Sequence, residues 1–206
     1  MTKTALLLVD IQNDFFPKGA LSVHHADEIL PAINQLLSFP FDVIVATKDF
    51  HPVNHGSFAE HHHKTPGEKV ILGGVEQILW PTHCVQGTYG AEFAPGWHTE
   101  KIDKVFFKGT ERTIDSYSAF FDNGHCKSTG LADYLNEHGI TDIYVAGLAT
   151  DYCVKYSVLD ALKLGFNVHV IKEGCRGVNL NSNDTDIAIS EMKVAGAKIE
   201  SVKFLK

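Results

Sequence analysis

The chain has 206 residues, of which 44% are hydrophobic, and it carries a formal net charge of −7. This length suits a single α/β domain over residues 1–206, and the hydrophobic content is too high for a disordered protein. A mildly acidic chain without clustered Lys and Arg, and without an apolar run of ~20 residues, is not expected to bind nucleic acid or to enter a membrane.

Short apolar runs alternate with helix-like segments along the chain. The runs at 4–9, 43–46, 105–107, 143–146, 168–171 and 199–204 are predicted as strands. Helical periodicity predicts helices over 27–37, 128–138, 151–164 and 185–195, the last three ending at Gly139, Gly165 and Gly196. Runs that are apolar on both faces are typical of parallel sheets covered by helices. The order therefore predicts a doubly wound, three-layer α/β/α fold around a mostly parallel six-stranded sheet.

One long irregular segment, 49–103, interrupts this alternation. A loop of this length inside a compact domain usually has a function.

The four cysteines are widely spaced, and the first residues pass directly into an apolar strand pattern without the features of a signal peptide. We therefore expect a cytoplasmic protein with free thiols. Three of the cysteines are expected to be buried apolar thiols: Cys84, Cys126 and Cys175.

Chemically capable residues follow four of the predicted strands. Asp10, Asp49, Lys108 and the segment 147–153 stand at the carboxyl ends of separate strands. These ends meet at the edge where open α/β sheets bind ligands. An acid, a second acid, a cation and a thiol would therefore be brought together, which suggests an active site.

Each of these residues also has an ordinary interpretation. Asp10 could be a polar strand terminus, or a general base whose pKa is raised by burial. Lys108 could extend to the surface, or pair with Asp10. Cys153 could be a buried apolar thiol, or a nucleophile whose pKa is lowered by the start of a helix.

A histidine-rich stretch offers metal ligands. The segment TKDFHPVNH places Asp49 and His51 two residues apart, and His83 follows in WPTHC. Carboxylate and imidazole ligands suit Zn(II), with Fe(II) or Mn(II) as alternatives, and three protein ligands leave coordination positions open. The run 61–63 of three histidines is more typical of a solvated loop.

Together these segments resemble the nicotinamidase/pyrazinamidase branch of the isochorismatase-like cysteine hydrolases. The resemblance rests on LLLVDIQNDFFPKGAL, ATKDFHPVNHGSFA, WPTHCVQGT, FFKGT followed by DSYSAF, and VAGLATDYCV, and it extends from residue 5 to about residue 199. Isochorismatases share the fold and nucleophile but lack the metal motif, so Asp49, His51 and His83 favour the nicotinamidase branch.

The resemblance implies a role for each matching residue. The catalytic triad would be Asp10, Lys108 and Cys153. The metal ligands would be Asp49, His51 and His83. The pyridine pocket would be lined by Phe15, Trp80, Tyr117 and Tyr152. A non-proline cis peptide would join Leu148 to Ala149, and the backbone N–H groups of Ala149 and Cys153 would form the oxyanion hole.

The implied activity is hydrolysis of nicotinamide, and also of pyrazinamide, through a cysteine thioester in NAD salvage. One divalent metal ion would be the cofactor, with zinc placed before iron or manganese. Three alternatives stay open: attack by metal-bound hydroxide with a structural Cys153, an inactive zinc-binding scaffold, and a related amidase. Whether the chain forms a homo-oligomer is also open.

Overall fold

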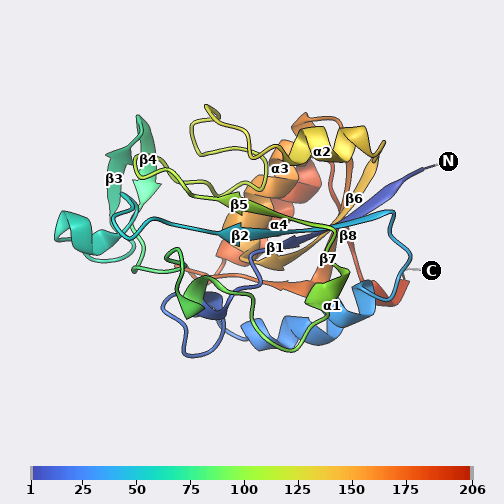
Figure 1. Ribbon diagram of the computed structural model, residues 1–206, viewed down its shortest axis with the longest axis horizontal. Coiled ribbons are helices and arrows are strands. Elements are labelled where there is room, and N and C mark those ends of the chain that lie inside the picture. Colours follow the sequence, from blue (N-terminus) through green and yellow to red (C-terminus); the bar gives the residue numbers. More distant parts are fainter. Residues whose placement is uncertain (1, 205–206) are drawn as a thin grey trace.

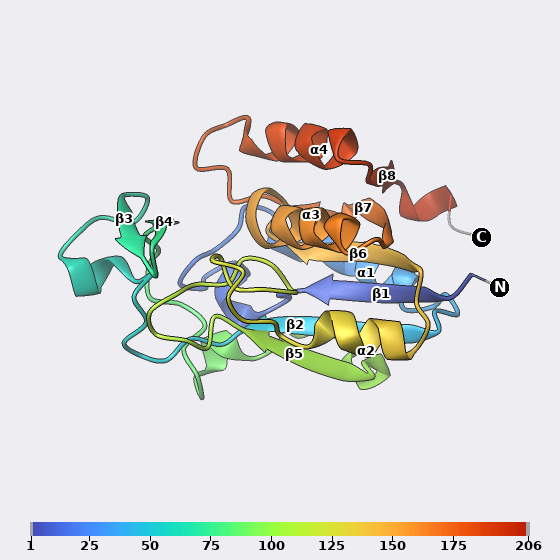
Figure 2. The ribbon, with the colours of Figure 1, turned by 90° about the horizontal axis from the view of Figure 1, so that it is seen from above.

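The computed structural model describes residues 2–204. Six strands form one sheet in the order β5-β2-β1-β6-β7-β8, and every neighbouring pair is parallel. The strands are β1 (Thr4–Val9), β2 (Val43–Asp49), β5 (Lys104–Lys108), β6 (Asp142–Leu148), β7 (Asn167–Arg176) and β8 (Lys198–Glu200). The chain begins at the centre of the sheet and builds outward to both edges (Figure 2), which confirms the predicted doubly wound α/β fold.

Helices cover both faces of this sheet (Figure 1). On one face lie α2 (Leu131–Glu137), α3 (Lys155–Lys163) and α4 (Asp184–Val194). On the other face, α1 (Leu30–Leu36) packs together with loop segments. None of the helices within residues 2–204 has both the length and the apolar character needed to span a bilayer.

Strand β1 shows why the central strands are apolar throughout. Leu6 and Leu8 pack into the core beneath α1, whereas Leu7 and Val9 pack into the core beneath α2, α3 and α4. Because both faces are buried, the strand needs no alternation of apolar and polar residues.

The helix ends differ from the predicted ones for local reasons. The predicted helix 27–37 is divided into a 3-10 turn, η2 (Ala26–Ile29), and α1. Pro31 has no N–H with which to continue an α-helical ladder back to Asp27. Helix α2 begins at Leu131 rather than at residue 128, because Gly130 adopts a φ of +85°. The expected stops hold: Gly139, Gly165 and Gly196 all have positive φ.

Some strands are longer or shorter than their apolar runs. Strand β2 continues from the predicted end at residue 46 to Asp49, and β7 continues to Arg176. Polar residues at these ends are still paired, as Asp49 is with Lys108 on β5. The last strand ends at Glu200, and a 3-10 turn, η7 (Val202–Phe204), follows it.

The segment 49–103 contains a β-hairpin that the sequence did not predict. Strands β3 (Lys69–Leu72) and β4 (Val75–Ile78) pair antiparallel away from the main sheet (Figure 1). The two residues between them, Gly73 and Gly74, have φ of +59° and +84°. Glycines adopt such angles without strain, and a two-residue glycine turn is a strong hairpin signal.

Candidate active site

Asp10, Lys108 and Cys153 meet at the carboxyl edge of the sheet. Lys108 Nζ lies 2.8 Å from Asp10 Oδ2 and 3.3 Å from Cys153 Sγ. All three residues are buried. An acid, an ammonium group and a thiol therefore share one enclosed site, as their positions at strand ends suggested; their catalytic roles stay a prediction.

Neighbouring groups fix the orientation of these side chains. Asp10 follows β1 with a φ of +50°, a conformation that Asp tolerates better than most residues. The Thr47 hydroxyl donates to Asp10 Oδ1 at 2.6 Å, which leaves Oδ2 facing Lys108. Lys108 Nζ also donates to the Ser116 carbonyl at 3.0 Å and pairs with the Asp49 carboxylate.

The oppositely charged side chains of this cluster stabilise one another in their ionised forms. Burial disfavours an ammonium ion, but Asp10 and Asp49 raise the pKa of Lys108 well above its usual value. Burial likewise opposes ionisation of Asp49, yet Lys108 and His51 hold the pKa of Asp49 well below its usual range. Burial raises the pKa of Asp10 against the attraction of Lys108. Asp10 is thus the more basic of the two carboxylates and the better proton acceptor.

The thiol environment differs from the expected one. Cys153 lies in a π-helical turn, η6 (Thr150–Val154), that leads into α3. Burial raises the pKa of Cys153 well above its usual value, and Lys108 offsets this only in part. Burial therefore opposes ionisation of this thiol, whereas Lys108 and the start of a helix favour it. A protonated thiol needs a base, and Asp10 is beside it.

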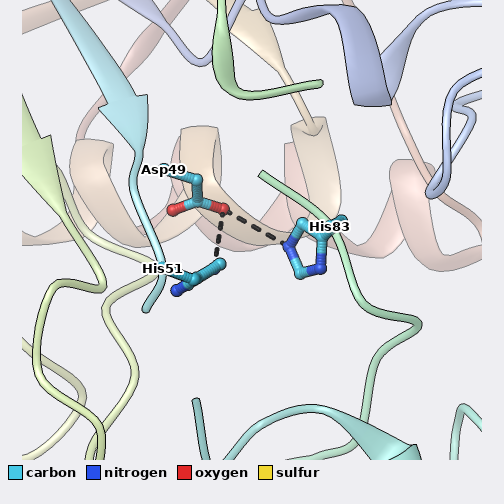
Figure 3. A group of neighbouring side chains, drawn as sticks. All are labelled: Asp49, His51 and His83. Carbon is cyan, nitrogen blue, oxygen red and sulfur yellow. Dashed lines mark ion pairs between the residues drawn. The ribbon is translucent and has the colours of Figure 1, made fainter. Parts of the chain in front are cut away.

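Asp49, His51 and His83 form a second buried group, shown in Figure 3. Asp49 Oδ2 lies 3.6 Å from Nε2 of His51 and 3.6 Å from Nε2 of His83. These distances are too long for hydrogen bonds. Metal–ligand bonds of about 2.0–2.2 Å place neighbouring ligand atoms roughly 3–3.5 Å apart, so the spacing approaches that of a coordination shell.

In each of the two histidine rings a hydrogen bond occupies Nδ1, and Nε2 stays available to bind a metal ion. Nδ1 of His51 lies 2.8 Å from the Gly109 carbonyl, and Nδ1 of His83 lies 2.8 Å from the Pro81 carbonyl. A carbonyl can only accept, so Nδ1 carries a proton, and in the neutral ring Nε2 presents its lone pair. Nε2 of His51 is buried without a hydrogen-bond partner in the described residues. Two imidazoles and a carboxylate arranged in this way fit a divalent metal ion.

Asp49 connects the two groups. Its Oδ1 pairs with Lys108, while its Oδ2 faces the two histidines. Gln12 anchors its backbone: Nε2 donates to the Asp49 carbonyl at 2.7 Å, and Oε1 accepts from the Asp49 N–H at 2.8 Å.

A cavity joins the thiol to the metal-compatible group. All four residues expected to surround a pyridine ring line it: Phe15, Trp80, Tyr117 and Tyr152. Cys153, Ala149, Asp49 and His83 also line it. The rings of Trp80 and Tyr152 meet edge to face, with centroids 4.8 Å apart. The expected non-proline cis peptide between Leu148 and Ala149 is present.

Further residues line this cavity that the sequence did not indicate. They are Leu21, Asp115 and Val178. Asp115 begins the motif DSYSAF, two residues before Tyr117, and this proximity was the available signal. Leu21 and Val178 carry no chemistry that would single them out in a sequence.

The remaining candidates behave as ordinary residues. His61 contacts the Val53 carbonyl at 3.1 Å and His62 contacts the Gly56 carbonyl at 2.7 Å, so both rings brace their loop. Neither belongs to a metal-compatible group in residues 2–204. Of the three cysteines expected to be buried apolar thiols, Cys84 and Cys175 are buried and free, as expected. Cys126 is also free but exposed, so that expectation is wrong for Cys126.

The chain is similar to known proteins over nearly its whole length. Residues 4–203 match the isochorismatase domain. The nicotinamidase of Escherichia coli (strain K12) is 48% identical over 202 residues, which are 97% of this chain and 95% of that protein. A solved nicotinamidase/pyrazinamidase of Acinetobacter baumanii is 44% identical with a TM-score of 0.94, covering 98% of each chain. A pyrazinamidase of Pyrococcus horikoshii, solved in complex with zinc, is 36% identical with a TM-score of 0.79, covering 97% of this chain and 99% of its own. The chain belongs to the isochorismatase family.

Proposed function

We propose that this chain is a nicotinamidase, a single-domain enzyme that hydrolyses nicotinamide to nicotinic acid and ammonia and also accepts pyrazinamide. The observation that carries the proposal is the aromatic cavity with Cys153 on its wall and Asp49 and His83 beside it. A pyridine carboxamide has two features that match: a flat ring with a basic nitrogen, and an electrophilic amide carbon.

In the first half-reaction Cys153 acts as the nucleophile. Its thiol proton passes to Asp10 Oδ2, and the sulfur attacks the carboxamide carbon. Lys108, 3.3 Å from Sγ, stabilises the thiolate as it forms. The N–H groups of Ala149 and Cys153 are the proposed donors to the tetrahedral oxyanion. Asp10 then protonates the leaving nitrogen, the C–N bond breaks, and ammonia and a thioester result.

In the second half-reaction water attacks the thioester. Asp10 now takes a proton from the water, the C–S bond breaks, and the proton returns to Cys153. Nicotinic acid leaves, and the enzyme is restored. The same carboxylate thus acts as base and acid in turn, which agrees with a pKa that burial raises.

The metal ligands would be Asp49, His51 and His83, with zinc favoured by this ligand set. A metal ion bound there would offer a Lewis-acid position for the pyridine nitrogen and so orient the ring. Phe15, Trp80, Tyr117 and Tyr152 would enclose the ring itself. We further propose a cytoplasmic enzyme of NAD salvage; whether it works as a homo-oligomer is a separate question for size-exclusion measurements.

The decisive experiment is ammonia release from nicotinamide by purified protein, with and without a chelator, alongside Cys153→Ala. We expect turnover by the parent, none by Cys153→Ala, and equal metal content in both. Activity of Cys153→Ala within tenfold of the parent would favour attack by metal-bound hydroxide instead. No ammonia from the parent would favour the inactive-scaffold alternative.

A further inference from the structure

One side chain of the hairpin that the sequence did not predict contacts two residues that line the substrate cavity, Tyr117 and Asp115. Gln77 on β4 is buried, and its amide nitrogen lies 2.9 Å from the Tyr117 hydroxyl. The same nitrogen lies 2.6 Å from the Ile78 carbonyl and 3.1 Å from Asp115 Oδ2. Gln77 has no role in the catalytic, metal-binding or substrate-binding groups described above.

The surroundings of Gln77 fix which end of its amide faces Tyr117. The Ile78 carbonyl and the Asp115 carboxylate are both acceptors, so only the NH₂ end can face them. The far side agrees: the Tyr117 N–H donates to Asn123 Oδ1 at 2.9 Å, so Asn123 Nδ2 must be the group that donates to Gln77 Oε1 at 3.1 Å. The amide nitrogen cannot accept a hydrogen bond, so it can only donate in its contact with the Tyr117 oxygen. Its two hydrogens are shared among three acceptors: the Ile78 carbonyl, the Asp115 carboxylate and the Tyr117 oxygen.

A second donor meets the same oxygen. Trp80 Nε1, which can only donate, lies 3.1 Å from the Tyr117 hydroxyl. A phenol oxygen accepts at most two hydrogen bonds, and both positions are now filled. Burial raises the pKa of Tyr117, so the phenol keeps its proton. Within residues 2–204 no group accepts a hydrogen bond from this O–H, although Tyr117 lines the cavity that holds Cys153.

We infer that Gln77 is a positioning residue: together with Trp80 it fills the acceptor positions of the Tyr117 hydroxyl, so that the O–H donates a hydrogen bond to the bound substrate. The inference rests on the proposed function, because the acceptor is a polar atom of the pyridine carboxamide. It assigns Tyr117 a polar role in recognition beyond its contact with the ring. The β3–β4 hairpin then contributes to substrate recognition, because it carries Gln77, which orients the Tyr117 hydroxyl.

The test is a double-mutant cycle of Tyr117→Phe and Gln77→Met, with KM and kcat measured for nicotinamide and nicotinate binding measured by calorimetry. One net hydrogen bond corresponds to roughly a tenfold effect. Tyr117→Phe should therefore raise KM and weaken nicotinate binding by roughly tenfold, with kcat within about threefold. Gln77→Met should do the same. In the Tyr117→Phe background it should add less than about twofold, because the hydroxyl through which it acts is gone.

Tyr156→Phe is the matched control. Its ring lies 5.3 Å from that of Tyr117, yet Tyr156 does not line the cavity, so its KM should stay within about twofold of the parent. Multiplicative effects of the two substitutions, or a loss confined to kcat, would assign Gln77 a merely structural role and overturn the inference.

The two proposals can fail separately. An active parent with an unaltered KM in Tyr117→Phe overturns this inference alone, even if Gln77→Met does not fold. A parent that releases no ammonia overturns the proposed function.

Discussion

Replacing Lys108 by Met would test whether the buried cluster is charged as described. The Lys108 side chain is fully buried, with Nζ 2.8 Å from Asp10 Oδ2 and in contact with Asp49. Methionine fills a similar volume but leaves two carboxylates without a cation between them. Removing one partner of a buried ion pair costs about 3–5 kcal/mol. For a chain of this size each kcal/mol lowers Tm by roughly 2–4 °C, so we expect Tm to fall by roughly 6–20 °C.

The assay is thermal unfolding at pH 7, followed by circular dichroism, with ammonia release measured on the same samples. Lys104→Met, at the exposed start of the same strand, is the control and should shift Tm by less than about 2 °C. Adding Asp10→Asn to Lys108→Met should recover part of the lost stability, because it removes one of the uncompensated charges. A Tm for Lys108→Met within about 2 °C of the parent would refute the reasoning, since it would mean that the carboxylates are not both ionised.

Four other outcomes are expected. Asp10→Asn keeps the shape of the side chain but cannot accept the thiol proton, so ammonia release should fall by at least ~100-fold; near-parental turnover would exclude Asp10 as the base. His51→Ala should lose metal in elemental analysis whereas His62→Ala, whose ring only braces the Gly56 carbonyl, should keep it; full occupancy in both would contradict the ligand assignment. Benzamide, which lacks the ring nitrogen, should have a kcat/KM roughly 10³-fold or more below that of nicotinamide, while pyrazinamide is turned over; comparable rates would show that the metal does not position the ring. Burial lowers the pKa of His55 to about 4, against about 6.5 in an unfolded chain. The contribution of the neutral ring to the free energy of unfolding is therefore fully present above about pH 6.5, and it is lost as pH falls toward about 4, by up to about 1.4 kcal/mol per pH unit. Between pH 7 and pH 5, the free energy of urea unfolding should fall less in His55→Gln than in the parent. Equal falls in the two proteins would argue against this role.

The fold could be predicted from the sequence where burial alone determines which residue types occur. Strand β1 matches its predicted bounds because both faces are covered and every position is apolar. The positions at which β2 and β7 end could not be predicted from the sequence. Strand pairing continues there through polar residues such as Asp49, whose hydrogen bonds depend on a strand that is distant in the sequence. The hairpin was missed because its residues are half exposed, with Ile71 73% accessible, so that only Gly73 and Gly74 marked it.

The candidate site divides in a similar way. Residues at strand ends could be predicted to meet, because parallel strands bring their carboxyl ends to one edge. The pairing of Asp49 with Lys108 could not be predicted, since it depends on the register between β2 and β5. Gln77 and Asp115 escaped notice because their importance lies in a network of contacts, which no local pattern of residues records.

The catalytic residues and the aromatic residues around the cavity come from different parts of the fold, and this affects how the site can change by mutation. Asp10 and Lys108 stand at the ends of sheet strands and Cys153 lies in the turn after β6, whereas Trp80 and Tyr117 belong to loops outside the sheet. Loops tolerate substitution and changes of length that a buried sheet does not. Bond cleavage and substrate choice are thus encoded in separate stretches of the chain. Exchanging the stretch around 66–80 between related proteins would be expected to redirect which ring is accepted while the hydrolytic chemistry is inherited unchanged.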